Sequence, residues 1–159
     1  MVIQRWQSVM LLISGIMMGI FSFMNLGVIQ AADYTFNVGA LGIFREGIAT
    51  EGGEPTGIST IYLFIDSVLA MLLPLVGIFC FKNMKLQKNI IYISMLTIVT
   101  SAALLTFKAS QFAGDLQAAD GVNWSVFVGA PLVALIADIV AIRLINSDIK
   151  RLRAADRLR

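Results

Sequence analysis

The sequence predicts an all-α integral membrane protein, a bundle of four transmembrane helices with both termini on the inner side. Hydrophobic residues make up 58% of its 159 residues and charged residues only 14%, whereas about a quarter of the residues of a soluble domain are charged. Four apolar stretches are each long enough to cross a hydrocarbon layer of about 30 Å. The basic residues gather in the segments that this layout places on one side.

The first expected span, 9–29, contains no charged residue and would cross the membrane as a helix at about 1.5 Å per residue. A cleaved signal peptide is the alternative, but its apolar region would be only about 7 to 15 residues long. We therefore interpret this stretch as a span within one membrane domain, 1–159. The other expected spans are 58–81, 90–108 and 122–145.

Two connections are expected on the outer side. The first, 30–57, holds four acids against Arg45 alone, and the second, 109–121, holds two acids and no basic residue. Aromatic and β-branched residues alternate in 34–39 and are followed by glycines, which is typical of short strands joined by a turn. A small β-hairpin in the first outer loop is therefore possible.

The inner side is expected to be basic. In this layout ten of the twelve Lys and Arg residues lie inside, and only Arg45 and Lys108 lie outside. Anionic headgroups attract such clusters, so the hinge 82–89 and the tail 146–159 are expected to bind lipid or a partner protein. The candidate residues are Lys82, Lys85, Lys88, Lys150, Arg151, Arg153, Arg157 and Arg159.

Four charged residues are candidate intramembrane polar sites: Asp66, Lys108, Asp138 and Arg5. Ionisable residues in a span usually face protein and are functional candidates. Asp66 shares a helical face with Ala70, Pro74 and Gly77, and Lys108 is expected to neutralise it.

Asp138 lies beside a seam of small residues, so it is expected to face a neighbouring helix. Its partner is expected to be Arg5, Gln7 or Ser14 if the first and fourth helices are neighbours. The seam consists of Ala130, Ala134, Ala137 and Ala141.

Two further patterns each have two interpretations. Ser94, Thr97 and Ser101 form a hydroxyl stripe that fits interhelical hydrogen bonds or an ion path. Gly15 and Gly19 form a GxxxG pattern, which fits contact within the bundle or a dimer.

The chain has no histidine and one cysteine, Cys80. An intrachain disulfide and a thiolate metal cluster are therefore excluded, and the commonest general base is missing. We expect no cofactor, no metal site, no enzymatic activity and no nucleic-acid binding.

The opening 2–8, the hinge Phe-Lys-Asn-Met-Lys-Leu-Gln at 81–87 and the closing Ala-Asp-Arg-Leu-Arg at 155–159 together resemble a family of small four-helix bacterial inner-membrane proteins known as a domain of unknown function. Met84 stands where the family usually has a basic residue. The resemblance spans the chain and implies a multi-pass protein of the bacterial inner membrane, with no implied substrate or catalytic residue.

Two functions remain open. The first is a non-enzymatic accessory or scaffold subunit whose basic inner face meets anionic lipid, a membrane-protein partner or a second copy. The alternative is a small proton- or cation-coupled transporter that uses Asp66 and Asp138.

Overall fold

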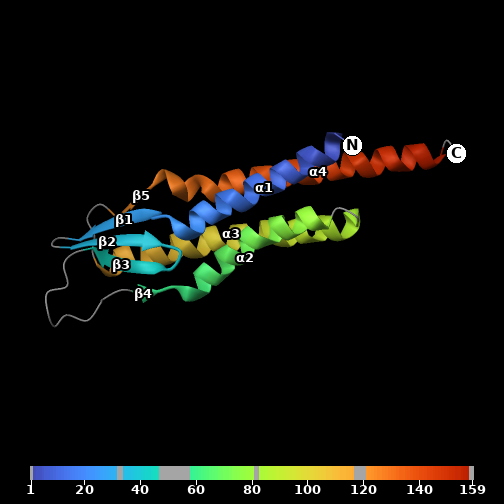
Figure 1. The fold of residues 1–159 in the computed structure, drawn as a ribbon. Helices are drawn as coiled ribbons and strands as arrows, with labels where there is room; N and C mark the ends of the chain where they lie inside the picture. Colours follow the sequence, from blue (N-terminus) through green and yellow to red (C-terminus); the bar gives the residue numbers. More distant parts are fainter. Residues whose placement is uncertain (1, 32–33, 47–57, 81–82, 117–120, 158–159) are drawn as a thin grey trace.

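The computed structural model describes residues 2–31, 34–46, 58–80, 83–116 and 121–157. Four long helices lie side by side, and a small sheet stands at one end of them (Figure 1). The start of the first helix and the end of the fourth lie at the other end. The helices are α1 (Val2–Phe23), α2 (Ile61–Phe79), α3 (Met84–Asp115) and α4 (Ala130–Arg157), and the 3-10 helix η1 (Val126–Gly129) precedes α4.

The bundle is apolar outside and partly polar inside. α1 packs against α2 and α4, and α3 packs against α2 and α4. The inward faces carry alanines and hydroxyls, among them Ser14, Ser67 and Ser94, whereas leucines, isoleucines and valines such as Leu69 and Ile136 point outward. The apolar outer surface distinguishes this bundle from a water-soluble one, whose outward helix faces are polar and charged.

All four helices are long and apolar enough to cross a membrane, which indicates a membrane protein. Their number confirms the sequence prediction. Their bounds correct it, because part of three of the expected spans belongs to a sheet.

Three expected span boundaries were wrong at the sheet end. α1 ends at Phe23, and the rest of the expected span 9–29 contains the strand β1 (Gly27–Ala31). The expected span 58–81 begins with the strand β4 (Ile58–Ser59), and 122–145 begins with the strand β5 (Val122–Trp124) and η1. The backbone in these stretches is extended and pairs with other strands of the sheet instead of continuing the helices.

The other helix ends also differ from the prediction. α3 begins inside the expected hinge 82–89, where the Asn83 side chain accepts a hydrogen bond from the Leu86 N–H at 3.3 Å and caps the helix. It continues to Asp115, into the expected outer loop 109–121. α4 runs unbroken into the expected tail 146–159 and extends beyond the other helices (Figure 1).

The hairpin expected in the first outer loop is present within a larger, antiparallel sheet. Strands β2 (Tyr34–Gly39) and β3 (Gly42–Glu46) form the hairpin, and the strand order is β4-β3-β2-β1-β5. β5 lies between α3 and α4 and pairs with β1, with Gly27 opposite Trp124. The α1–α2 and α3–α4 connections therefore contribute strands to one sheet.

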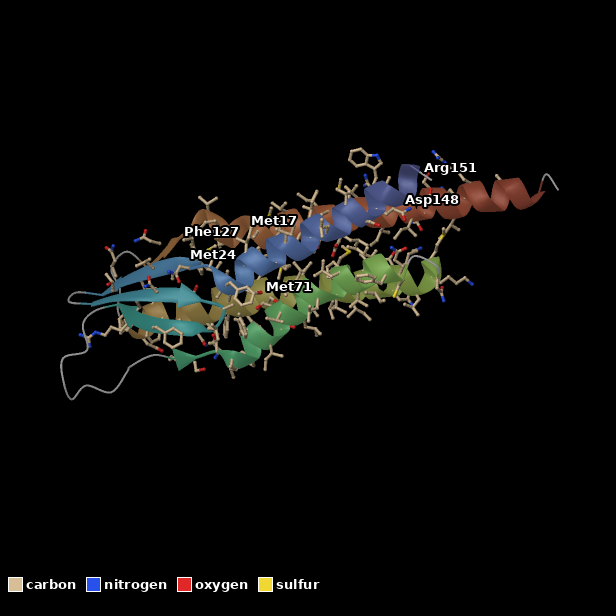
Figure 2. The ribbon with its side chains drawn as sticks, in the orientation of Figure 1. Met17, Met24, Met71, Phe127, Asp148 and Arg151 are labelled. Carbon is tan, nitrogen blue, oxygen red and sulfur yellow. The ribbon has the colours of Figure 1, made fainter. Side chains whose placement is uncertain are left out.

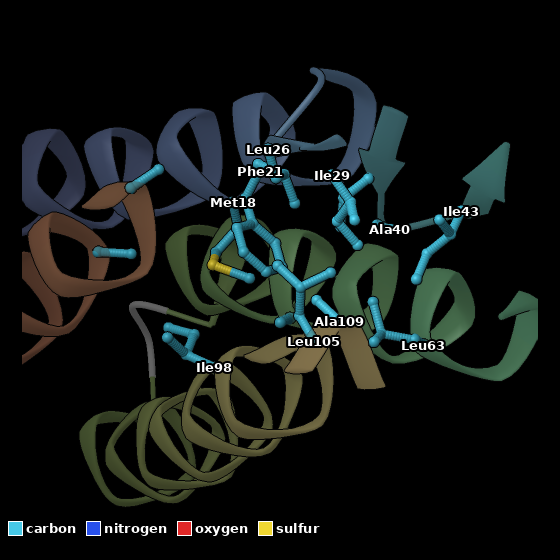
Figure 3. Close-up of a cluster of buried hydrophobic side chains, with 14 of the residues drawn as sticks. Met18, Phe21, Leu26, Ile29, Ala40, Ile43, Leu63, Ile98, Leu105 and Ala109 are labelled. Carbon is cyan, nitrogen blue, oxygen red and sulfur yellow. The ribbon is translucent and has the colours of Figure 1, made fainter. Parts of the chain in front are cut away.

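One face of the sheet packs on the neighbouring end of the bundle (Figure 3). Ile29, Phe36, Val38 and Ile43 are buried there with Phe21 of α1 and Leu63 of α2. The rings of Phe36 and Phe112 meet edge to face with their centroids 5.2 Å apart, a favoured geometry. The last turns of α3 thus support the sheet.

The GxxxG pattern packs within the chain. A Cβ atom at Gly15 would lie 2.9 Å from Leu75 Cδ2 and 3.3 Å from the Met71 carbonyl oxygen, and one at Gly19 would lie 3.3 Å from Met71 Sδ. These glycines let α1 approach α2, which confirms the bundle-contact interpretation.

Candidate functional site

Asp138 lies in the interior of the bundle, fully buried on α4. The buried alanines Ala134, Ala137 and Ala141 share its helix and let neighbouring backbones come close. Ser94 of α3 donates a hydrogen bond from its hydroxyl to Asp138 Oδ2 at 2.9 Å. The prediction that Asp138 faces protein is confirmed, and α3 supplies its hydrogen-bond donor.

Ser14 faces the same carboxyl from α1. Its hydroxyl oxygen is fully buried and has no hydrogen-bond partner, and the same is true of Asp138 Oδ1. Side chains from α1, α3 and α4 therefore meet at one point, where two of the oxygens are unpaired. We call Asp138, Ser14 and Ser94 the Asp138 cluster.

Asp66 has different surroundings. It is half-buried at the seam between α2 and α3, and its Oδ2 accepts hydrogen bonds from Ser101 at 2.7 Å and Thr100 at 3.1 Å. Both acids are therefore bound by hydroxyls of α3. The residues predicted to share the face of Asp66, namely Ala70, Pro74 and Gly77, are buried as expected.

The hydroxyl stripe of α3 connects the levels of the two acids. Ser101 and Ser94 are seven residues apart, about 10 Å along a helix, and the Thr97 hydroxyl between them donates to the Ser94 carbonyl oxygen at 2.8 Å. The stripe makes interhelical hydrogen bonds at both ends. It thus matches the first of its two interpretations.

Lys108 does not neutralise Asp66. No ion pair within 4.0 Å joins the two among the residues that the structure describes, and Asp66 is bound by hydroxyls instead. The reason is depth: Lys108 follows Ser101 by seven residues, about 10 Å nearer the sheet along α3. That prediction was wrong.

The end of the bundle away from the sheet is held by two other polar contacts. Gln7 of α1 donates to Asp148 Oδ2 at 2.6 Å, and Lys88 of α3 donates to Asn146 Oδ1 at 2.8 Å. Gln7, an expected partner of Asp138, is therefore engaged nearer the end of α4. The side chain of Arg5 lies outside the described part of the structure.

The predicted basic residues fall on α3 and α4. Lys85 is exposed at the start of α3, and Lys150 and Arg151 are exposed on α4; Figure 2 shows Asp148 and Arg151 near the start of α1, away from the sheet. Lys88 is held by Asn146. Outside the described side chains lie Lys82, Arg153, Arg157 and Arg159.

The chemistry available in the interior is hydrogen bonding and proton exchange. Among the described residues, no three His, Cys, Asp or Glu side chains are placed to hold a metal ion. Cys80 is a free thiol at the end of α2.

Sequence reasoning found Asp138 and the hydroxyl stripe but did not join them. The missing step was depth: Ser94 lies four residues from the start of the expected span 90–108, and Asp138 lies seven residues from the end of 122–145, so their depths differ by only about 5 Å. A fully apolar helix has few donors, so a serine at matching depth is the natural partner of a buried carboxyl. That signal was available from the sequence.

Comparison with protein families identifies one match. The family described as "Domain of unknown function (DUF4293)" matches residues 3–158. A search of curated proteins gave no match.

Proposed function

The chain belongs to the DUF4293 family, and we propose that it is a non-enzymatic membrane subunit or scaffold of the bacterial inner membrane. In this proposal the four helices cross the bilayer, the sheet lies on the outer side, and the start of α1 and the end of α4 lie in the cytoplasm. The charge distribution supports this orientation, because short Lys- and Arg-rich segments are retained on the cytoplasmic side.

The observation that carries the proposal is the length of α4. It extends beyond the other helices at the end away from the sheet, and Lys150 and Arg151 are exposed there. A projecting basic helix offers a surface for anionic headgroups or for an acidic face of a partner protein.

Affinity purification of the full chain in mild detergent, followed by mass spectrometry, tests this proposal. A partner at constant stoichiometry is expected, and it should be lost when Lys150 and Arg151 are both changed to Gln. Lys108→Gln, which removes a positive charge at the other end of α3, is the matched control and should keep the partner. Recovery of the chain as a monomer, with neither another protein nor a second copy of itself bound at constant stoichiometry, would contradict the subunit proposal.

Proton- or cation-coupled transport is the second candidate. It is favoured by one observation, that the α3 hydroxyl stripe runs between the levels of Asp66 and Asp138. Reconstituted protein would then carry a pH-driven or cation-driven flux that Asp138→Asn and Asp66→Asn each abolish. A flux that survives both substitutions would exclude these acids from transport.

A further inference from the structure

Four basic residues lie along the seam where the start of α3 packs against α4. Lys88 of α3 donates to Asn146 Oδ1 of α4 at 2.8 Å, so the two helices are joined at this level. Arg143 lies three residues before Asn146 and Lys150 four residues after it, which places all three on one face of α4. Lys85 lies one turn before Lys88 on α3. We call Lys85, Lys88, Arg143 and Lys150 the basic seam.

The two ends of α3 and α4 match in level along the basic seam. Because the helices run in opposite directions, one turn toward the start of α3 corresponds to one turn toward the end of α4. Lys85 and Lys150 therefore lie at similar levels. Their sequence neighbours, Met84 and Ile149, belong to one apolar cluster, which agrees with this arrangement. Lys85, Lys150 and Arg143 are exposed.

The nearest described acid of α4 faces another helix. Asp148 accepts from Gln7 of α1 at 2.6 Å, and residues two apart on a helix do not share a face. Asn146, which holds Lys88, is neutral. Among the side chains that the structure describes, the basic seam therefore carries positive charge alone. A surface of one sign of charge concentrates ions of the opposite sign.

The surface between the basic seam and the sheet is apolar. On both helices, exposed apolar residues continue the faces that carry Arg143 and Lys85, at helical spacing. They are Leu132, Ile136 and Ile139 of α4 and Tyr92, Leu96 and Val99 of α3. On α4 this stripe extends about 16 Å from Arg143, which is the depth of one leaflet of a hydrocarbon core of about 30 Å.

We propose that the basic seam binds a phospholipid with an anionic headgroup. The phosphate lies between α3 and α4, where Arg143 and Lys88 contact it, and an acyl chain lies along the apolar stripe. A guanidinium can donate two N–H groups to one phosphate, and Lys88 has two N–H donors beyond the one that Asn146 accepts. A free phosphate ion would leave the apolar stripe uncovered.

This proposal rests on the proposed function for the place of the chain in a bilayer. It assigns the basic seam to lipid, whereas the projecting end of α4 stays available to a partner protein. Basic pockets between helices at the cytoplasmic side of a membrane are suited to anionic headgroups.

Native mass spectrometry of the purified full-length chain, titrated in detergent with phosphatidylglycerol or phosphatidylcholine, tests the proposal. One phosphatidylglycerol molecule should bind more tightly than phosphatidylcholine. Arg143→Gln and Lys85→Gln should each weaken its binding about fivefold, the usual contribution of one basic residue near anionic headgroups. Both side chains are exposed, and an unchanged melting temperature checks that the variants fold.

Arg151→Gln is the matched control. It also removes one positive charge from α4, but Arg151 follows Asp148 by three residues and lies with it near the start of α1 (Figure 2). This variant should keep the affinity for phosphatidylglycerol. Equal weakening by Arg143→Gln and Arg151→Gln would reduce the effect to general charge attraction and overturn the site.

A second variant tests the seam from its neutral residue. Asn146→Asp keeps an acceptor for Lys88 but adds a negative charge, so it should weaken phosphatidylglycerol binding without lowering the melting temperature. Unchanged affinity in this variant, or equal affinity of the native chain for the two lipids, would contradict the proposal. Displacement of the lipid by an equal concentration of inorganic phosphate would overturn the role of the acyl chain.

Failure of this proposal is distinguishable from failure of the proposed function. The titration contains no partner protein, so its result does not depend on whether affinity purification recovers one. Loss of a protein partner in Arg143→Gln, with phosphatidylglycerol binding unchanged, would assign the basic seam to that protein and overturn the lipid site.

Discussion

Ser94 donates a hydrogen bond to Asp138 across 2.9 Å, and this buried contact ties α3 to α4 near the middle of the bundle. Apolar side chains gain little by leaving lipid for protein, so small residues and polar contacts hold such helices together. The contact between Ser94 and Asp138 fixes the register of α3 against α4.

Replacing Asp138 by leucine should therefore lower the free energy of unfolding by about 0.6 to 2 kcal/mol, the range of interhelical polar contacts in membranes. Asp138→Asn should stay close to wild type, because its amide oxygen can accept from Ser94 and its N–H can donate to Ser14. Thermal unfolding in mild detergent measures both. Ile139→Leu, at the neighbouring exposed position, is the control. A leucine variant as stable as the control would show that the cluster does not hold the bundle.

Gly15→Ala should destabilise the bundle by about 1 to 3 kcal/mol, the usual effect of overpacking. The new methyl group would meet Leu75 at 2.9 Å and the Met71 carbonyl at 3.3 Å. Gly114→Ala on α3 is the matched control, since its methyl group meets nothing within 4 Å and helix propensity favours alanine. Equal thermal stability of the two variants would contradict the close packing of α1 on α2.

Phe112→Ala should loosen the sheet from the bundle, because it removes the ring that meets Phe36. Phe112 is partly buried, so the loss of stability should be smaller than the about 3 to 5 kcal/mol of a fully buried phenylalanine. Hydrogen exchange should quicken in β1 and β2 while the middle of α4 stays protected. Phe107→Ala removes an exposed ring of the same helix and should leave the strands protected; equal exchange in both variants would refute the support from α3.

The end of α4 should be protected by anionic lipid. Trypsin should cut at the exposed Lys150 and Arg151 more slowly in nanodiscs with anionic lipid than in zwitterionic ones. Added salt should abolish the difference, because it screens exposed charges within about 10 Å at 0.1 M. Cleavage rates that depend on neither lipid charge nor salt would contradict lipid binding, and a partner protein would be the remaining candidate for this segment.

The helices were predictable because apolar length and charge segregation are strong signals, and the burial of Asp138 followed from its small neighbours. The strands β1 and β5 at the ends of the expected spans were not predictable. Gly27–Ala31 is uncharged and continues an apolar helix pattern, so only Asn25 and Gly27 indicated a break. Val122–Trp124 is three residues long and needed its partner β1 to be identified as a strand.

The unbroken course of α4 was missed for another reason. The tail 146–159 was expected to be separate from the fourth span because it is charged. However, Ala, Leu, Arg and Lys are all good helix formers, and no Gly or Pro interrupts them in this part of α4. The charges of a segment indicate its surroundings, whereas its helix propensity decides whether the helix continues.

Labelling of single cysteines in intact cells tests the central claim, a four-span protein with the sheet outside and the hinge inside, most directly. In a Cys80→Ser background, an impermeant thiol reagent should label Ser59→Cys, which is exposed on β4, without permeabilisation. It should label Lys85→Cys, exposed at the start of α3, only after the cells are opened. Labelling of Lys85→Cys in intact cells, with Ser59→Cys protected, would contradict the account.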